Sequence, residues 1–182
     1  MSLTFTKHAV DALNAATSCA RQLGHDHIGS EHIFLSILAI PQCQAARRLE
    51  TLGLSLDDLA ESMRAMVSGG ADSTMQRGQL PITARTRKII EMAGVEAGAG
   101  NPVGTAHLVL AMLRDGDNAA SQLLFNAGVT VDKFISAGTQ GSAPDTDTAQ
   151  EADGEAQQDD EGSDGEGEQG SSSGANGKAQ KT

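Results

Sequence analysis

The sequence contains neither tryptophan nor tyrosine, and phenylalanine occurs only four times. Proteins that bind single-stranded nucleic acid without sequence preference stack the bases on aromatic side chains. They also offer positive charge to the phosphates, whereas this chain has a formal net charge of -11. The lack of aromatic platforms and of net positive charge argues against a nucleic-acid partner, and equally against an anionic membrane surface.

Cysteine is scarce as well. Cys19 and Cys43 are the only two, and no CxxC spacing occurs. Two thiols without a disulfide framework suit a reducing cytosol, although a single disulfide stays open as an alternative. The N-terminus lacks the basic region and apolar core of a signal peptide, and no apolar run approaches the roughly 20 residues of a membrane span. We expect a cytoplasmic protein that does not contact a membrane.

The C-terminal part of the chain lacks apolar residues. No Val, Ile, Leu, Met or Phe occurs after Gly138, while residues 139–182 contain eleven acidic residues and two lysines. Such a segment has nothing to bury against its ordering entropy, so we predict a disordered acidic tail over residues 138–182. The tail either keeps the protein soluble or binds basic segments of a partner. Residues 1–137 are nearly neutral and numerous enough to bury a core.

Within residues 1–137, apolar side chains recur at spacings of three and four, as is typical of amphipathic helices. Thr6 and Thr83 are predicted N-caps, and Ser55 begins a further helix. Glycines such as Gly24 and Gly128 mark helix ends. The pattern predicts four helices in each half and no strand.

One stretch occurs twice. Residues 23–32 contain a Gly followed by Ser30 and, two residues later, by His32, and an apolar run follows; residues 101–107 repeat this order. We predict Ser30 and Thr105 as N-caps of two buried helices. The second copy is two residues shorter between its first two helices, and we place this deletion in the glycine-rich residues 97–100.

The two copies predict one all-α domain of eight helices with pseudo-twofold symmetry. Its repeats cover about residues 4–67 and 81–137, and residues 68–80 form a polar linker. The two buried helices are expected to lie side by side near the symmetry axis.

The chain resembles the Clp N-terminal (Clp repeat) domain of ClpC-type bacterial protein unfoldases. The residues that carry the resemblance are Phe5-Thr6, Leu23-Gly24-His25, Ile28-Gly29-Ser30-Glu31-His32, Leu52-Gly53, Pro81-Ile82-Thr83, Gly104-Thr105-Ala106-His107 and Gly128. Those unfoldases also contain ATPase modules, but no GxxxxGK[ST] occurs here, so we expect no nucleotide binding. The resemblance implies a stand-alone, non-enzymatic module without a cofactor. Its partners would be proteins: Clp substrates, adaptors or the unfoldase itself, with the chain acting as an accessory factor or a decoy.

The resemblance also implies a ligand. In the related domains, the Glu of a Gly-Thr-Glu-His motif helps to bind phosphorylated arginine. Glu31 matches this residue, whereas Ala106 replaces it in the second copy, so we expect one site and not two. Thr6 and Thr83 mark helix starts whose free N–H groups suit a phosphate. Alternatively, Glu31 is a first-turn acid that the helix dipole favours.

Four neighbouring side chains suggest a metal instead: His25, His27, Glu31 and His32. If they bound one, the chain would be a metal-dependent hydrolase. Their spacing fits no common zinc signature, however, and the second copy keeps only His107. We therefore predict no metal, and we interpret His32 and His107 as hydrogen-bonding the turn that precedes their helix.

Overall fold

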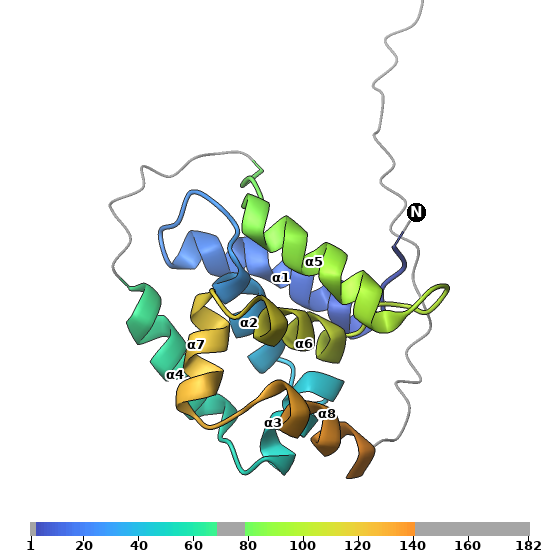
Figure 1. Cartoon of the computed structure of the whole chain (residues 1–182). Helices are drawn as coiled ribbons and strands as arrows, with labels where there is room; N and C mark the ends of the chain where they lie inside the picture. The colour runs from blue at the N-terminus through green and yellow to red at the C-terminus, as the bar shows by residue number, and fades with distance from the viewer. Residues whose placement is uncertain (1–2, 69–78, 141–182) are drawn as a thin grey trace, which may run out of the picture. The chain divides into compact units, whose positions relative to one another are not determined.

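The computed structural model describes residues 3–68 and 79–140. These residues form eight helices and two isolated β-bridges, without a strand in either range (Figure 1). The predicted all-α fold is confirmed. Most of the predicted linker and the predicted tail beyond Gln140 lie outside the described residues. The helices are α1 (Lys7–Gln22), α2 (Ser30–Leu38), α3 (Gln44–Thr51), α4 (Leu56–Val67), α5 (Ala84–Ala97), α6 (Thr105–Asp115), α7 (Ala119–Asn126) and α8 (Val131–Gln140).

Three helices begin at the predicted caps. The side chain of Thr6 accepts a hydrogen bond from an N–H of the first turn of α1, and Ser55 and Thr83 do the same for α4 and α5. Each cap satisfies one N–H that has no partner inside the helix. These caps depend only on residues three positions apart, which explains why the sequence predicted them.

The predicted caps of the two buried helices were wrong. Gly29 and Gly104 are the N-cap residues of α2 and α6, and Ser30 and Thr105 are the first residues inside the helices. The Thr105 hydroxyl instead accepts the N–H of Ala45 in α3, at an N–O distance of 3.2 Å. A residue of the second repeat therefore satisfies an N–H at the start of a helix in the first.

The two repeats interlock instead of forming separate lobes. α1 packs on α2, and α5 packs on α6. The shorter helices cross over, because α3 packs against α6 and α8 while α4 packs against α7. α2 and α6 also contact each other, and nearly all of their side chains are buried. The predicted pair of adjacent buried helices is confirmed, and the core around it is shared by both repeats.

The two residues missing from the second repeat shorten a helix. α1 has 16 residues and α5 has 14, whereas residues 23–29 and 98–104 form connections of equal length. The predicted place of the deletion, in the glycine-rich residues 97–100, was therefore wrong. The packing explains the difference, because both connections must deliver an equivalent turn to an equivalent buried helix.

The last helix continues beyond residue 137. α8 runs to Gln140, and Gly138 is buried under the guanidinium of Arg48. A Cβ atom at position 138 would overlap that guanidinium, so a larger residue here would require the Arg48 side chain to move. None of the helices in the described ranges has the length and apolar character needed to cross a bilayer.

Candidate functional site

Two short backbone bridges join the repeats. Phe5 pairs with Val103, and Ile28 pairs with Ile82. In the first bridge, the Thr6 N–H donates to the Val103 carbonyl at 3.0 Å, and the Val103 N–H donates to the Thr4 carbonyl at 2.8 Å. Each bridge therefore ties the start of one repeat to the turn before the buried helix of the other.

The second bridge repeats this geometry with the repeats exchanged. The Ile28 N–H donates to the Pro81 carbonyl at 2.8 Å, and the Thr83 N–H donates to the Ile28 carbonyl at 3.1 Å. The turn that leads to Glu31 is thus tied to the start of α5 at Thr83. Thr6, at the start of α1, is tied instead to the turn that leads to Ala106. The structure does not bring the three predicted site residues together at one place.

Glu31 folds back over the start of its own helix. Its Oε1 atom lies 3.5 Å from Nδ1 of His32, and its Oε2 atom lies 3.5 Å from the hydroxyl of Ser30. The carboxylate covers Gly29 so closely that a Cβ atom there would overlap it. The side chain is 18% exposed. This is the position of a first-turn acid stabilised by the helix dipole, so that alternative has a geometric basis; phosphoarginine binding stays a prediction.

His32 and His107 hydrogen-bond the turns that precede their helices, as predicted. Nδ1 of His32 accepts the N–H of Gly29 at 2.8 Å, and Nδ1 of His107 accepts the N–H of Gly104 at 3.0 Å. In each case the ring satisfies an N–H at the helix start that no backbone carbonyl can reach. The His32 side chain is completely buried, so its role is structural.

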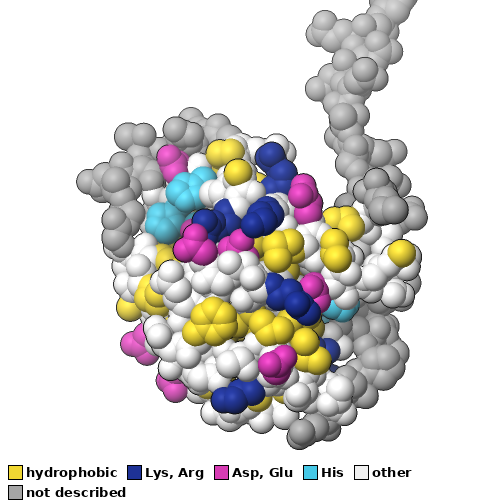
Figure 2. Space-filling model, viewed as in Figure 1, with side chains coloured by type: hydrophobic (Ala, Val, Ile, Leu, Met, Phe, Trp, Pro, Cys, Tyr) yellow, Lys and Arg dark blue, Asp and Glu magenta, His cyan; other side chains and the backbone are white. Residues whose placement is uncertain are grey.

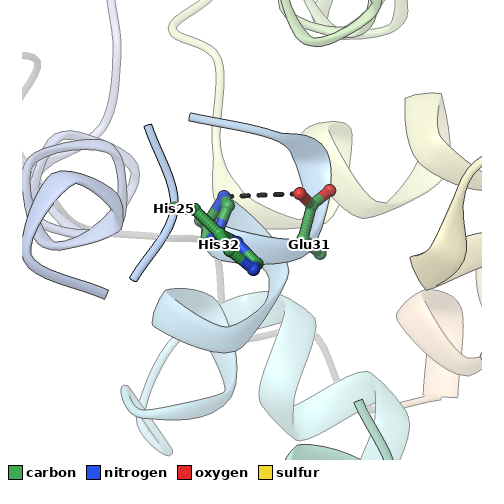
Figure 3. A group of neighbouring side chains, drawn as sticks. All are labelled: His25, Glu31 and His32. Carbon is green, nitrogen blue, oxygen red and sulfur yellow. Dashed lines mark hydrogen bonds and ion pairs between the residues drawn. The ribbon is translucent and has the colours of Figure 1, made fainter. Parts of the chain in front are cut away.

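The predicted histidine cluster exists. Nδ1 of His25 lies 2.6 Å from Nε2 of His32, and the nearest ligand atoms of His25, Glu31 and His32 all fall within 4.8 Å of one another (Figure 3). The ring of His27 stacks on that of His25 at a centroid distance of 6.1 Å, while its Nδ1 lies 2.7 Å from Oδ1 of Asp26.

The hydrogen bonds of His32 argue against a metal at this cluster. Because Nδ1 of His32 accepts the Gly29 N–H, a neutral His32 carries its proton on Nε2. That Nε2–H donates to Nδ1 of His25. Both nitrogens of His32 are thereby occupied, and ligation at either would break a buried hydrogen bond. The alternative of a metal-dependent hydrolase has no support in this donor set.

Burial keeps His32 neutral. It lowers the pKa of His32 to about 4, even though the Glu31 carboxylate acts in the opposite direction. Burial also raises the pKa of the half-buried Cys19 thiol, against the effect of Arg64. A thiol held in its neutral form is a poor nucleophile, so Cys19 is best described as a core residue.

The feature that sequence reasoning missed is a groove between α1 and α5. Both helices contribute residues to its lining, although the described residues show no direct packing between α1 and α5. The groove has a volume of ≈ 380 Å³. Apolar side chains form most of its lining: Phe5, Leu13, Ile28, Ile33, Leu80, Ile82 and Ile90. Asn14, Thr17 and Arg21 add polar groups along one face of α1.

Part of the groove could have been recognised from the sequence. The positions of Asn14, Thr17 and Arg21 are spaced by three and four, so they lie on one helix face. Local sequence could not reveal that α5 lies opposite this face. Both backbone bridges border the groove, because Phe5, Ile28 and Ile82 each contribute to its lining.

Taken together, the fold and the groove define an all-helical double-repeat protein with crossed bridges and an apolar cleft between equivalent helices. The sequence profile of the family described as Clp repeat (R) N-terminal domain matches residues 4–127. The chain therefore belongs to this family. The resemblance inferred from the motifs is confirmed.

Known relatives agree with this assignment. The ATP-dependent Clp protease ATP-binding subunit ClpA homolog of Cyanidium caldarium is 35% identical over 134 residues, which covers 72% of this chain and 16% of that protein. The negative regulator of genetic competence ClpC/MecB of Bacillus subtilis (strain 168) is 32% identical over 131 residues, or 71% of this chain and 16% of that protein. The chain thus matches only a small part of these relatives.

Solved structures share the fold. The Hsp104 N-terminal domain from Candida albicans has a TM-score of 0.62 at 16% identity, covering 73% of this chain and 87% of that one. The N-domain of ClpV from Vibrio cholerae also has a TM-score of 0.62, at 15% identity, covering 73% and 80%.

Proposed function

We propose that this chain is a non-enzymatic protein-binding module of the Clp system, which holds an extended apolar segment of a partner protein in the groove between α1 and α5. The observation that carries this proposal is the apolar lining of that groove on a member of the Clp repeat family. Partners of this kind are Clp substrates, adaptors or an unfoldase.

The chemistry of the groove favours an extended segment. Its apolar side chains remove a partner's side chains from water, at roughly 25 cal/mol per Å² of apolar surface. The main-chain groups of the segment still need hydrogen bonds, since an unsatisfied buried polar group is costly. Asn14 and Thr17 supply polar side-chain groups along one wall.

A matched pair of substitutions tests the groove. Ile82 is 41% exposed and lines it, whereas Ile135 on α8 is 39% exposed and does not. Ile82→Glu should weaken binding of a permanently unfolded probe, reduced and carboxymethylated lactalbumin, by about tenfold or more, because it places a charge in an apolar lining. Ile135→Glu should leave the affinity within about twofold of the unsubstituted chain. Equal affinity in all three proteins, measured by calorimetry at neutral pH, would rule out the groove.

A finer proposal concerns phosphoarginine. We propose that its guanidinium pairs with Glu31 and that its phosphate meets the start of α5 at Thr83, because the Ile28–Ile82 bridge ties these two segments together. Thr6 would serve a second site only if position 106 carried a carboxylate. Binding requires the Glu31 side chain to swing away from Gly29 and His32.

Calorimetry with free phosphoarginine tests this arrangement. One site is expected, and Glu31→Gln should cost about 1.5–3 kcal/mol of binding free energy, the range for a hydrogen bond to a charged group. Ala106→Glu should add a second site beside Thr6. Two equal sites in the unsubstituted chain, or an affinity indifferent to Glu31→Gln, would contradict the proposal and favour the first-turn role of Glu31.

A degradation assay distinguishes a decoy from an accessory factor. If the chain acts as a decoy, adding it to a full-length ClpC-type unfoldase and its protease should slow the degradation of a substrate that the groove binds. If it acts as an accessory factor, the same addition should accelerate degradation. The Ile82→Glu variant is the control for either result, since it should have no effect.

A further inference from the structure

The two bridges share their backbone geometry but differ in the side chains beside them. Beside the Ile28–Ile82 bridge, His32 bonds to a second imidazole, that of His25. Beside the Phe5–Val103 bridge, the position equivalent to His25 is Gly100. Figure 2 shows histidine side chains gathered near the connection between α1 and α2, where one face of the cluster reaches the surface.

The hydrogen bonds around His32 form a short series in which the donor and the acceptor of each bond are fixed. The Gly29 N–H donates to Nδ1 of His32, and Nε2–H of His32 donates to Nδ1 of His25. His25 must therefore leave its Nδ1 unprotonated. These two hydrogen bonds hold the loop of residues 24–29 at His25 and at Gly29, and Ile28 directly precedes Gly29.

Protonation of His25 breaks this series of hydrogen bonds. With both ring nitrogens protonated, His25 has only donors and faces the Nε2–H of His32. The contact can then survive only if His32 moves its proton to Nδ1, where it would oppose the Gly29 N–H. Each arrangement of the protonated pair keeps one of the two side-chain hydrogen bonds and loses the other. The loop that presents Ile28 therefore loses one of its two side-chain tethers.

We propose that the His25–His32 pair makes the groove proton-sensitive: protonation of His25 loosens the Ile28–Ile82 bridge and, with it, one wall of the groove between α1 and α5. The change is a gain of one proton without any covalent step. Its meaning as regulation rests on the proposed function of the groove, whereas the loosening itself does not.

The surrounding charges do not remove this effect. Among the described residues, the charges that act on His32 are those of Glu31, His25 and His27, and Asp26 interacts with both His27 and His25. Cys19 on α1 interacts with Glu31 and with Arg64 on α4. The carboxylate of Glu31 favours the protonated form of His32. The stacked ring of His27 opposes it once that ring is itself charged.

Hydrogen exchange measured by NMR on the full chain tests the proposal, with an internal control. The amides of Ile28 and Thr83 report on the proton-sensitive bridge, and those of Val103 and Thr6 report on its equivalent. Between about pH 7.5 and pH 5, where imidazoles titrate, protection at Ile28 and Thr83 should fall by about tenfold relative to Val103 and Thr6, the factor for one lost hydrogen bond. In His25→Asn, whose Oδ1 accepts in place of Nδ1 and does not titrate, this difference between the bridges should vanish.

The outcomes separate cleanly. Equal losses at both bridges, or the same selective loss in His25→Asn, would overturn the proposal. Binding of the lactalbumin probe at pH 7.5 is a separate readout. If Ile82→Glu leaves it unchanged while the bridge still loosens on acidification, then the function of the groove fails and the proton-sensitive bridge stands.

Discussion

Acidification should destabilise this domain through His32, and the magnitude follows from its burial. The completely buried ring has its pKa lowered to about 4, whereas an unfolded chain has a histidine pKa near about 6.5. As the pH falls below about 6.5, the unfolded state therefore binds a proton that the folded state does not bind. Stability from this group is fully present above that pH and is lost progressively as the pH falls to about 4.

The expected loss is a substantial fraction of the stability of an ordinary domain. A shift of one pKa unit corresponds to about 1.4 kcal/mol, so this group removes about 2 kcal/mol from the free energy of unfolding by pH 5 and about 3 kcal/mol by pH 4. Domains of this size have about 5–15 kcal/mol in total. At pH 5 the carboxylates remain largely ionised, which separates the effect of His32 from general acid denaturation.

The assay is urea unfolding followed by far-ultraviolet circular dichroism at pH 8, 7, 6 and 5, because the chain has no tryptophan or tyrosine to report by fluorescence. His32→Asn is the informative variant, since its Oδ1 can accept the Gly29 N–H without titrating. It should lose about 2 kcal/mol less than the unsubstituted chain between pH 8 and pH 5.

Two results would refute this reasoning. Equal pH dependence in His32→Asn and the unsubstituted chain would mean that burial does not keep His32 neutral. A gain of stability on acidification would mean that the Glu31 carboxylate stabilises the imidazolium by more than burial opposes it.

Two further predictions concern the fold. Thr105→Val should lower the free energy of unfolding by about 1–3 kcal/mol, because it leaves the buried Ala45 N–H unsatisfied. Thr51→Val removes an exposed bond within one helix and should cost less than about 0.5 kcal/mol. Urea unfolding of both variants measures the two costs, and equal costs would contradict the prediction. Removal of residues 141–182 should leave the melting temperature unchanged at moderate salt, because that segment has no large apolar side chain to bury. A drop of several degrees on removal would show that the tail stabilises the domain.

Much of this protein could be predicted from its sequence. The caps at Thr6, Ser55 and Thr83, the apolar periodicity of the helices and the duplicated turn at residues 23–32 and 101–107 led to eight helices, two repeats and the Clp repeat family. The bonds from His32 and His107 to their turns were also predicted correctly. All of these features depend on residues a few positions apart, so their physics is local.

The tertiary structure decided the rest. Ser30 and Thr105 have the residue types of N-caps, but the Gly–His bonds cap their helices, and Thr105 serves α3 of the other repeat. The crossed bridges tie the turn before Glu31 to the start of α5 at Thr83, and they tie Thr6 to the turn before Ala106. The groove exists only because α1 and α5 lie opposite each other. These outcomes depend on contacts between residues far apart in the chain, and a local pattern carries no information about which distant turn will lie beside it.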